Sequence, residues 1–277
     1  MTDLNPQAKQ MADESMVRTL EAQARAIWPQ EAPLLQRYAL PAQPRILDAG
    51  CGTGEGASRL AELFPQASVL GVDIIDDHLE LARVRHARLG SRLAFAHQSI
   101  YELAATTATF DLTVCRHVLH SIPYPDRVIA ELVRVTRPGG TLHLIAEDYG
   151  MLHFQRAAGV DGLDPREFWH VVPERFGAAT ESDLFVGRNA FGILTALGMA
   201  AITVDYVVVD TVRVPRATFA SILEAWRDGY VDAIGQLTPI SRASALAYFN
   251  QMIANVRAPN GYAVWMVPVV SARVPSS

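Results

Sequence analysis

A run of small and acidic residues between positions 45 and 56, RILDAGCGTGEG, has the composition of a nucleotide-binding turn. Asp48 is followed by glycines at every second position, Gly50, Gly52 and Gly54. A glycine turn between a strand and a helix lets a ligand approach the backbone, because no Cβ stands in the way. The first N–H groups of the following helix are unsatisfied and favour negative charge. A tight turn without a ligand is the alternative interpretation.

A second acid, Asp73, lies 19 residues after Gly54, at the end of the next apolar run. In doubly wound sheets an acid at this place accepts hydrogen bonds from ribose hydroxyls. Ile74 and Ile75 follow it, where they could cover one face of an adenine. The alternative role of Asp73 is to cap the next helix, which Asp76 could do instead.

Two histidines, His117 and His120, lie in the segment RHVLHSI after the fourth apolar run. Residues three apart share one face of a helical turn, and imidazole titrates near neutral pH, so either histidine could be a general base. We predict that His120 is the base, because it lies further along the loop. The alternative is that His117 packs beside a cofactor and His120 only lines the pocket. No further Cys or acid at ligand spacing completes a zinc set, so we predict no metal.

A third polar group, Glu147, Asp148 and Tyr149, follows the fifth apolar run. We include Asp148 and Tyr149 among the candidate catalytic residues, as groups that contact an acceptor. Helix capping or a solvated strand end is the alternative role of the two acids. Arg116 either pairs with one of these acids or recruits a carboxylate or phosphate of the acceptor.

Alternating strands and helices must position these residues. Apolar runs and helical periodicity predict a mostly parallel sheet with right-handed crossovers, which is an α/β fold. The expected strands are 45–50, 68–75, 92–98, 110–117, 141–148, 201–210 and 261–273, and the expected helices are 14–28, 55–64, 77–90, 126–135 and 187–198. Pro29 and Pro33 are expected to interrupt the first helix, and a short second helix would follow them.

Two segments do not fit this alternation. Residues 149–185 contain aromatic clusters and no clear strand, and residues 215–257 read as a helical insertion. The predicted organisation is an N-terminal helical lid, a ligand-binding core, two helical cap insertions and two segments that complete the sheet. The corresponding ranges are 1–40 for the lid, 41–148 for the core, 149–186 and 212–259 for the cap, and 187–211 and 260–277 for the remaining sheet.

Composition narrows the class of protein. The chain has 277 residues, half of them apolar, and a formal net charge of −5 with scattered Lys and Arg, so nucleic acid is not expected as a partner. Cys51 and Cys115 form no disulfide framework, which favours reduced thiols in the cytoplasm. The polar N-terminus does not resemble a signal peptide. The apolar stretch 189–204 is too short to span a membrane.

In this order, the segments ILDAGCGTGEG, VLGVDII, FDLTVCRHVLHSI and ELVRVTRPGG resemble the class I S-adenosylmethionine-dependent methyltransferases over about residues 40–147. The resemblance implies a Rossmann-like, doubly wound sheet of seven strands whose last strand is antiparallel. It also implies that S-adenosyl-L-methionine is the cofactor and S-adenosyl-L-homocysteine the product. Asp48, Gly50 and Gly52 would surround the methionine part, with the carbonyl of Cys115 near its ammonium, and Asp73 would hold the ribose.

The resemblance places the adenine after the third strand, where an acid usually takes its amino group. Here Ser99 occupies that position, and Gln98 or Ser99 could accept the bond instead. Ile74, Ile100 and Arg116 complete the predicted cofactor-binding residues.

The implied reaction is methyl transfer to O, N or C of a small organic acceptor by in-line displacement, with a base only where the acceptor must lose a proton. Aromatic side chains of the two insertions suggest an acceptor with an apolar or aromatic body: Phe154, Phe168, Trp169 and His170 from the first, and Phe219, Trp226 and Tyr230 from the second. Packing of the cap on the sheet is the alternative role of these residues.

Other functions compete with methyl transfer. One is non-methyl chemistry with the same cofactor, such as a cyclisation. Another is a nicotinamide-dependent oxidoreductase, because Gly52, Gly54 and Ala57 loosely fit the dinucleotide fingerprint, but no convincing catalytic Tyr–Lys or Cys–His pair accompanies them. A third is a scaffold without catalysis.

Overall fold

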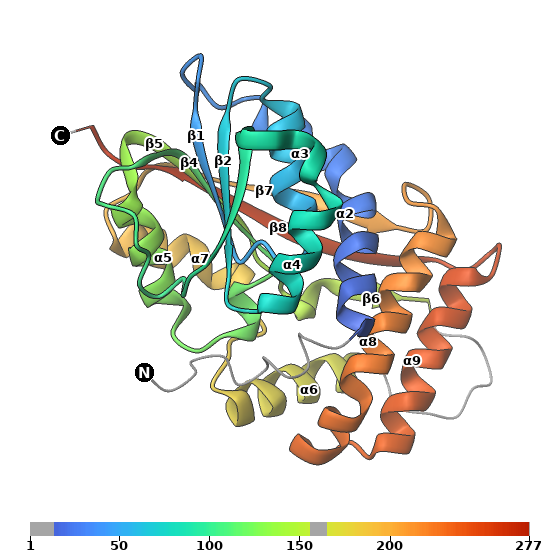
Figure 1. Cartoon of the computed structure of the whole chain (residues 1–277). Helices are drawn as coiled ribbons and strands as arrows, with labels where there is room; N and C mark the ends of the chain where they lie inside the picture. Colours follow the sequence, from blue (N-terminus) through green and yellow to red (C-terminus); the bar gives the residue numbers. More distant parts are fainter. Residues whose placement is uncertain (1–13, 156–164, 277) are drawn as a thin grey trace.

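A computed structural model describes residues 14–155 and 165–276. It contains one sheet of eight strands covered by helices on both faces (Figure 1). The strands are β1 Arg45–Ala49, β2 Ser68–Asp73, β3 Leu93–His97, β4 Phe110–Arg116, β5 Thr136–Ile145, β6 Leu152–Phe154, β7 Ala200–Asp210 and β8 Ala263–Arg273.

The sheet has the order β3-β2-β1-β4-β5-β8-β6, and β7 pairs with the other edge of β8. The first five strands pair in parallel, whereas β8 runs antiparallel to β5, β6 and β7. The Rossmann-like α/β fold and the antiparallel last strand are therefore confirmed. The last two long strands, β7 and β8, pair with each other in antiparallel fashion.

The number of strands is eight rather than seven, because the segment 152–154 forms the short strand β6. No strand was predicted there. The strand β8 is 11 residues long, but β5 pairs only with its residues 269–273. The earlier part of β8 thus leaves backbone groups open, and β6 pairs with residues 263–265. A three-residue strand of this kind depends on its partner and has no periodicity of its own to reveal it.

Helices α3 (Glu55–Leu63) and α4 (Asp76–Arg85) follow β1 and β2, and α5 (Pro125–Val135) and α7 (Val186–Ala196) precede β5 and β7. One apolar core lies between the sheet and α3, and another lies between the sheet and α5 with α7. Alternation along β1 sends the Ile46 side chain to the first core and Leu47 to the second. Both faces of the central strands are therefore buried, as expected of a parallel sheet.

Helix α2 runs without a break from Glu14 to Leu35 and contains Pro29 and Pro33. The predicted interruption at these prolines is wrong. Each proline removes one backbone donor, but the helix is held along its length by contacts with α8, β7 and α3. Its side chains Ile27 and Leu35 are completely buried. Tertiary packing thus outweighs the local preference for a helix end.

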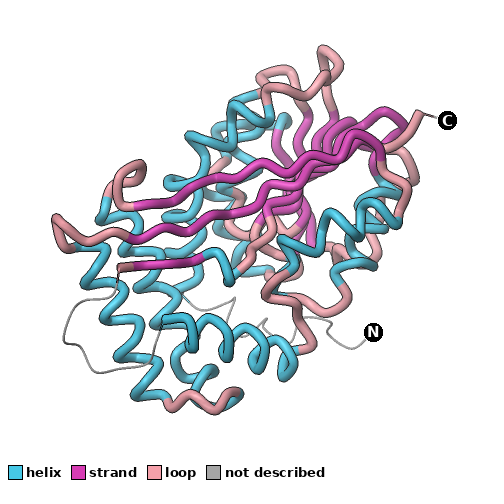
Figure 2. Tube along the Cα trace, turned by 180° about the vertical axis from the view of Figure 1, so that it is seen from behind, coloured by secondary structure: helices cyan, strands magenta, loops and turns pink. Residues whose placement is uncertain are grey.

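The cap consists of α6 (Pro165–Thr180), α8 (Arg216–Leu237) and α9 (Arg242–Arg257). It has its own apolar core, which includes side chains from α2, β6, β7 and β8. In Figure 2 the two long strands β7 and β8 extend out of the parallel part of the sheet and over the cap helices. The cap and the sheet therefore share strands. The predicted domain boundaries remain a prediction, and residues 1–13 and 156–164 of the predicted lid and cap lie outside the described residues.

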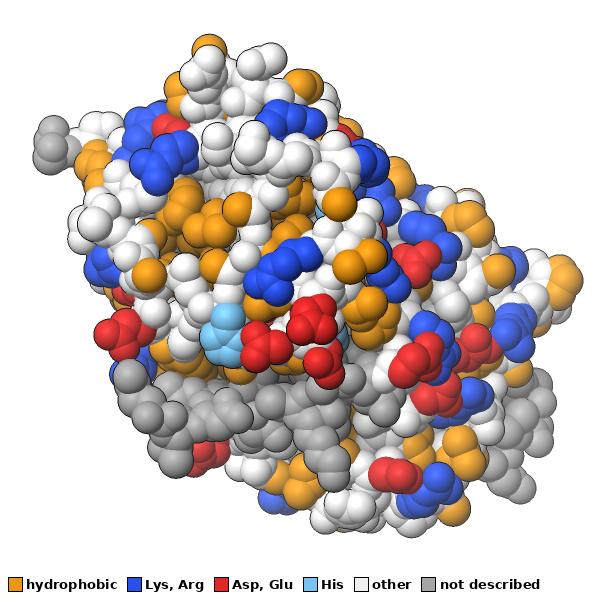
Figure 3. Space-filling view, in the orientation of Figure 1, with side chains coloured by type: hydrophobic (Ala, Val, Ile, Leu, Met, Phe, Trp, Pro, Cys, Tyr) orange, Lys and Arg blue, Asp and Glu red, His pale blue; other side chains and the backbone are white. Residues whose placement is uncertain are grey.

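Acidic and basic side chains are interspersed on the face shown in Figure 3. Within residues 14–155 and 165–276, no helix combines the length and the apolar character that crossing a membrane requires.

Candidate active site

The glycine turn joins β1 to α3 at the carboxyl edge of the sheet. Gly50, Gly52 and Gly54 all have positive φ angles, of 75°, 51° and 80°. The N–H groups of Gly50 and Cys51 donate to the carbonyl of Val72, at 2.8 and 2.9 Å. The left-handed backbone explains why three glycines are needed here, since a side chain would strain the chain at each of these positions.

The carboxylate of Asp73 at the end of β2 stabilises this turn. Its Oδ2 accepts the N–H of Gly52 at 2.8 Å, and its Oδ1 accepts the N–H groups of Ile74 and Ile75 at 2.8 and 3.0 Å. Asp73 therefore supports the start of α4 as well as the glycine turn. Since each carboxylate oxygen can accept two bonds, Oδ2 retains capacity for a ligand hydroxyl. The ribose contact stays a prediction.

A buried ionic network lies on the face of the sheet that α2 covers. The guanidinium of Arg116 contacts both carboxylate oxygens of Glu31, at 2.8 and 2.6 Å. Nε2 of His143 lies 3.2 Å from the same carboxylate, and its Nδ1 lies 2.7 Å from the hydroxyl of Tyr38. The expectation that Arg116 pairs with an acid after β5 is wrong, because its partner comes from α2.

Asp48 lies next to this network. Both Asp48 Oδ2 and Arg116 Nη1 lie within about 3 Å of the point where a Cβ on Gly56 would stand, so the carboxylate and the guanidinium approach each other there. Burial raises the pKa of Asp48 to about 7, although Arg116 acts in the opposite direction. Burial alone would also raise the pKa of Glu31, but Arg116 and His143 outweigh it and hold that pKa at about 2.

The region expected to receive an adenine is half open. Ile74 is half-buried and Ile100 is buried in the core beside β1 and β2. Ser99 is exposed. The side-chain carbonyl of Gln98 already accepts the N–H of Ala104 at 3.0 Å. The Oγ of Ser99 accepts the N–H of Tyr101 at 3.3 Å, so both side chains already have a local partner, and the adenine contact stays a prediction.

Cys51 and Cys115 are buried free thiols. Burial raises the pKa of each, so neither is a reactive thiolate. The role predicted for Cys115 concerns only its carbonyl and remains untested.

His117 and His120 meet on one carboxylate, that of Glu147. Nδ1 of His117 bonds to Oε1 of Glu147, and Nδ1 of His120 lies 2.6 Å from Oε2. Glu147 is completely buried, and His117 is 8% exposed. Burial would raise the pKa of Glu147, but the two imidazoles hold it well below its usual range. The carboxylate is therefore ionised at neutral pH. The two histidines share this carboxylate rather than one face of a helical turn, because His117 has a φ of 59° and the short helical turn begins only at Leu119.

Asp148 and Tyr149 separate in the structure. The carboxylate of Asp148 pairs with Arg188, with both contacts at 2.5 Å, and accepts the N–H of Gly150 at 3.0 Å. The capping role considered for Asp148 is therefore present, while its catalytic role remains a prediction. The ring of Tyr149 lies edge-on to His120 with 5.6 Å between ring centres.

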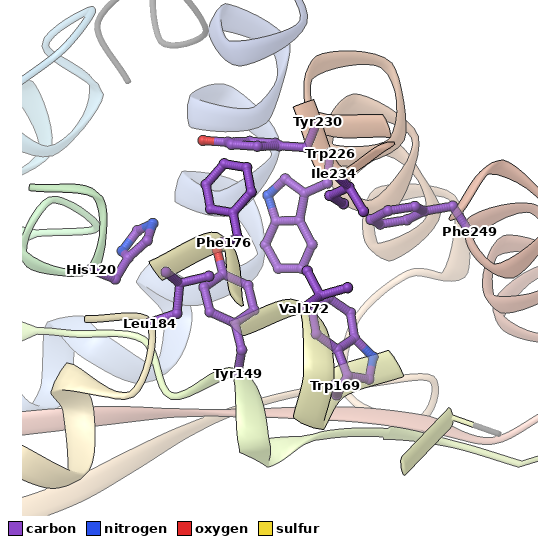
Figure 4. A pocket seen from close by; sticks show the side chains of 10 residues that line it. All are labelled: His120, Tyr149, Trp169, Val172, Phe176, Leu184, Trp226, Tyr230, Ile234 and Phe249. Atoms are coloured by element: carbon purple, nitrogen blue, oxygen red, sulfur yellow. The ribbon is translucent and has the colours of Figure 1, made fainter. Parts of the chain in front are cut away.

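An aromatic cavity opens beside these histidines, between the sheet edge and the cap. It contains about 460 Å³ of empty space, including its opening to solvent. In Figure 4 the imidazole of His120 stands at one side and the ring of Tyr149 near the centre. The lining residues are His120, Tyr149, Trp169, Val172, Phe176, Leu184, Trp226, Tyr230, Ile234 and Phe249. No Asp, Glu, Lys or Arg is among these described residues.

Three of the predicted aromatic cap residues, Trp169, Trp226 and Tyr230, line this cavity. The others do not. Phe168 and Phe219 are completely buried in the cap core, and Phe154 packs against that core. His170 is exposed, with Nδ1 3.7 Å from Glu174. For these four side chains the structure shows packing or surface positions rather than a place in the cavity.

Glu31 is absent from the predicted site residues, although the sequence carries a signal for it. Glu31 stands four residues after Ile27 and four before Leu35, so an acid lies on the apolar face of α2. An acid on such a face points to a buried ionic partner. Glu147 was named in the polar group after the fifth apolar run, but nothing in the sequence indicates that it bridges both histidines.

The residues of the glycine turn fit an S-adenosyl compound on one condition. A Cβ on Gly50 would stand 2.4 Å from Val118 Cγ2, and a Cβ on Gly52 would stand 2.8 Å from Leu20 Cδ1. The absence of side chains at the turn and the carboxylates Asp48 and Asp73 suit such a ligand, but Leu20 of α2 covers Gly52. A ligand lying on Gly52 therefore has to displace the side chain of Leu20.

Comparisons with known proteins agree on one family for the core. A family model described as a methyltransferase domain matches residues 46–140. An uncharacterized protein of Synechococcus sp. is 42% identical over 104 residues, which are 37% of this chain and 25% of that protein. A ubiquinone biosynthesis O-methyltransferase of Xanthomonas axonopodis pv. citri is 33% identical over 105 residues, which are 38% of this chain and 43% of that enzyme. The matches thus cover less than half of each relative.

One solved structure resembles the whole chain. Phosphoethanolamine N-methyltransferase 2 of Haemonchus contortus, in complex with phosphomonomethylethanolamine and S-adenosylhomocysteine, has a TM-score of 0.61. The two sequences are 17% identical, and the likeness covers 99% of this chain and 61% of the other. At this identity the likeness concerns the fold, which includes both the sheet and the cap.

Proposed function

Residues 46–140 of this chain belong to the class I S-adenosylmethionine-dependent methyltransferase family, and from this we propose that the protein transfers a methyl group from S-adenosyl-L-methionine to a small organic acceptor. The observation that carries the proposal is a juxtaposition. The glycine turn and the strand ends of the family region lie on the same sheet edge as His120, which lines the aromatic cavity.

Several residues would hold the cofactor. Gly50 and Gly52 would lie under its methionine part, Asp48 would face its ammonium, and the free capacity of Asp73 Oδ2 would bind a ribose hydroxyl. Ile74 would lie against the adenine. Bound there, S-adenosyl-L-methionine supplies an electrophilic methyl group on a sulfonium and leaves as the neutral thioether S-adenosyl-L-homocysteine.

The residues of the chain contribute position and proton acceptance. The aromatic walls of the cavity orient an apolar acceptor and exclude water, which supplies much of the rate through proximity. His120 takes the proton of an acceptor that has one to lose. The name of the Xanthomonas relative, an O-methyltransferase, supports an oxygen acceptor without identifying it. The buried free thiols Cys51 and Cys115 support a cytoplasmic location.

Calorimetric titration with S-adenosyl-L-homocysteine tests the cofactor site. We expect saturable heat with one site per chain, and a stabilisation of about 2.7 kcal/mol at about a hundred times the dissociation constant. NADH at the same concentration is the control and should give neither effect. Absence of heat with S-adenosyl-L-homocysteine, or an equal response to NADH, would refute the cofactor assignment.

Methyl-labelled S-adenosyl-L-methionine tests the reaction itself. Incubated with the protein and a panel of small phenols, amines and carbon acids, it should transfer label to an acceptor. Binding of the cofactor with all label retained on it would instead support the non-methyl chemistry considered above.

A further inference from the structure

Among the described residues, Glu147 is the only acid whose carboxylate contacts both His117 and His120. It follows β5, which lies next to β4 in the sheet, and so reaches the segment after β4 that carries His117 and His120. Nδ1 of His117 forms a hydrogen bond with Oε1, and Nδ1 of His120 lies at ion-pair distance, 2.6 Å, from Oε2. This arrangement leaves the Nε2 atoms of both rings directed away from Glu147.

The two imidazole rings differ in which groups their Nε2 atoms can contact. Nε2 of His117 is buried and has no hydrogen-bond partner among the described residues. His117 also has a left-handed backbone, with φ of 59°, which costs about 1 kcal/mol and is held by its surroundings. His120 lines the aromatic cavity, so its Nε2 is the ring nitrogen left for an acceptor.

The cavity restricts the chemistry of that acceptor. Its described lining has no acidic or basic side chain other than His120, and six of its ten residues are Phe, Tyr or Trp. A phosphate on the acceptor would be desolvated there without a counter-ion. Burial raises the pKa of Tyr149 well above its usual range, so that hydroxyl stays protonated and cannot serve as the base.

We infer that Glu147 is a positioning residue which fixes His120 as the base, and that the acceptor is a phenol whose hydroxyl meets Nε2 of His120. The inference rests on the proposed function and narrows its substrate class. Nε2 takes the phenolic proton as the oxygen–carbon bond forms and the carbon–sulfur bond breaks, with that electron pair remaining on sulfur. One positive charge is lost at sulfur and one appears on the imidazole, where the Glu147 carboxylate balances it.

Binding of 4-nitrophenol tests this step without any cofactor, because its ionised form has a distinct visible absorption. We expect the wild-type protein to bind it with a larger phenolate fraction than in free solution at the same pH. In Glu147→Gln the phenolate fraction of the bound ligand should fall at least tenfold. The ether 4-nitroanisole, which has the same ring but no proton to lose, should bind both proteins within a factor of two.

Two further variants make the test decisive. Asp111 lies at the start of β4, at the opposite end of that strand from His120, and its buried carboxylate pairs with Arg137. The variant Asp111→Asn removes this carboxylate and should keep the phenolate band. If Glu147→Gln does not fold, His120→Asn provides the same comparison, since His120 is only partly buried. This variant should also lose the band while still binding 4-nitroanisole.

Three results would overturn the inference: no binding of 4-nitrophenol by the wild type, an unchanged phenolate band in folded Glu147→Gln, or an equal loss of 4-nitroanisole binding. Since no cofactor is added, each result is independent of the cofactor titration. A labelled product carrying its methyl group on nitrogen or carbon would also overturn it while leaving methyl transfer intact.

Discussion

Among the single residues of the site, two neighbouring buried acids, Glu31 and Asp48, differ in their ionisation. Glu31 has both oxygens paired with Arg116, and its carboxylate stays ionised. Asp48 shares the same guanidinium less directly, and burial dominates its ionisation. The difference arises from hydrogen bonding, since a charge taken out of water is stable only where partners replace its hydration. Asp48 is therefore the acid that titrates near neutral pH.

We predict that Asp48→Asn flattens part of the pH dependence of stability. The folded pKa of Asp48 is about 7 and lies above its ordinary value of 3.8, so between these values the unfolded chain releases this proton first. Stability of the wild type therefore falls as the pH rises through this window. Urea unfolding of both proteins at about pH 5 and pH 7 should show roughly 2 kcal/mol more loss in the wild type. Parallel curves would contradict the raised pKa.

At the scale of elements, the β1–α3 turn and helix α2 enclose the cofactor region from two sides. The turn brings its backbone close to Val118, which leaves no room for a side chain on Gly50. Gly90, at a kink inside the short helical segment Ala87–Arg92, has a positive φ of 57° but nothing within 4 Å of a Cβ. Substituting each of these two glycines therefore distinguishes the cost of backbone strain from the cost of a steric clash.

We predict that Gly50→Ala and Gly90→Ala share one effect and differ in another. Both place alanine at a positive φ, which costs about 1–3 kcal/mol of stability, and at Gly90 the ψ of −140° lies outside the left-handed helical region. Gly50→Ala also forces Val118 to move, which costs about 1–3 kcal/mol more. Calorimetry should show at least tenfold weaker binding of S-adenosyl-L-homocysteine by Gly50→Ala and unchanged binding by Gly90→Ala. Equal weakening in both would show that the turn is not the ligand site.

At the scale of the whole molecule, α2 connects the cap to the sheet. It contacts α8 on one side and α3 and β7 on the others, while Leu20 covers the glycine turn and Glu31 holds Arg116. In Figure 1 the helix stands between α3 and α8. Helix α2 thus contacts the cofactor region, the cap and the sheet. The buried ion pair Glu31–Arg116 holds the helix in this position.

We predict that Glu31→Gln lowers the free energy of unfolding by about 3–5 kcal/mol, because Arg116 is left buried without its full partner. Glu14→Gln on the same helix removes the exposed pair with Arg18 and should cost less than about 1 kcal/mol. Urea denaturation measures both. A similar small loss in the two variants would indicate that the network around Glu31 does not anchor α2.

The parallel core and its carboxyl edge can be predicted from the amino-acid sequence. Strong apolar runs alternate with helices there. Each site residue predicted in this region lies within a few positions of the end of the strand that positions it. Asp48, Gly50, Gly52 and Asp73 could be located because parallel strands bring their carboxyl ends to one edge whatever the rest of the chain does. The same local rule brought His117, His120 and Glu147 to that edge.

The partners of these groups, and the segments that cover them, follow from the packing of distant elements and could not be predicted. Glu31 reaches Arg116 across 85 positions, α2 continues through Pro29 and Pro33, and β6 exists because β8 offers an open edge. The cavity collects side chains from separate helices of the cap. Contacts between distant segments depend on how elements pack, and local periodicity carries no record of a partner that lies far along the chain.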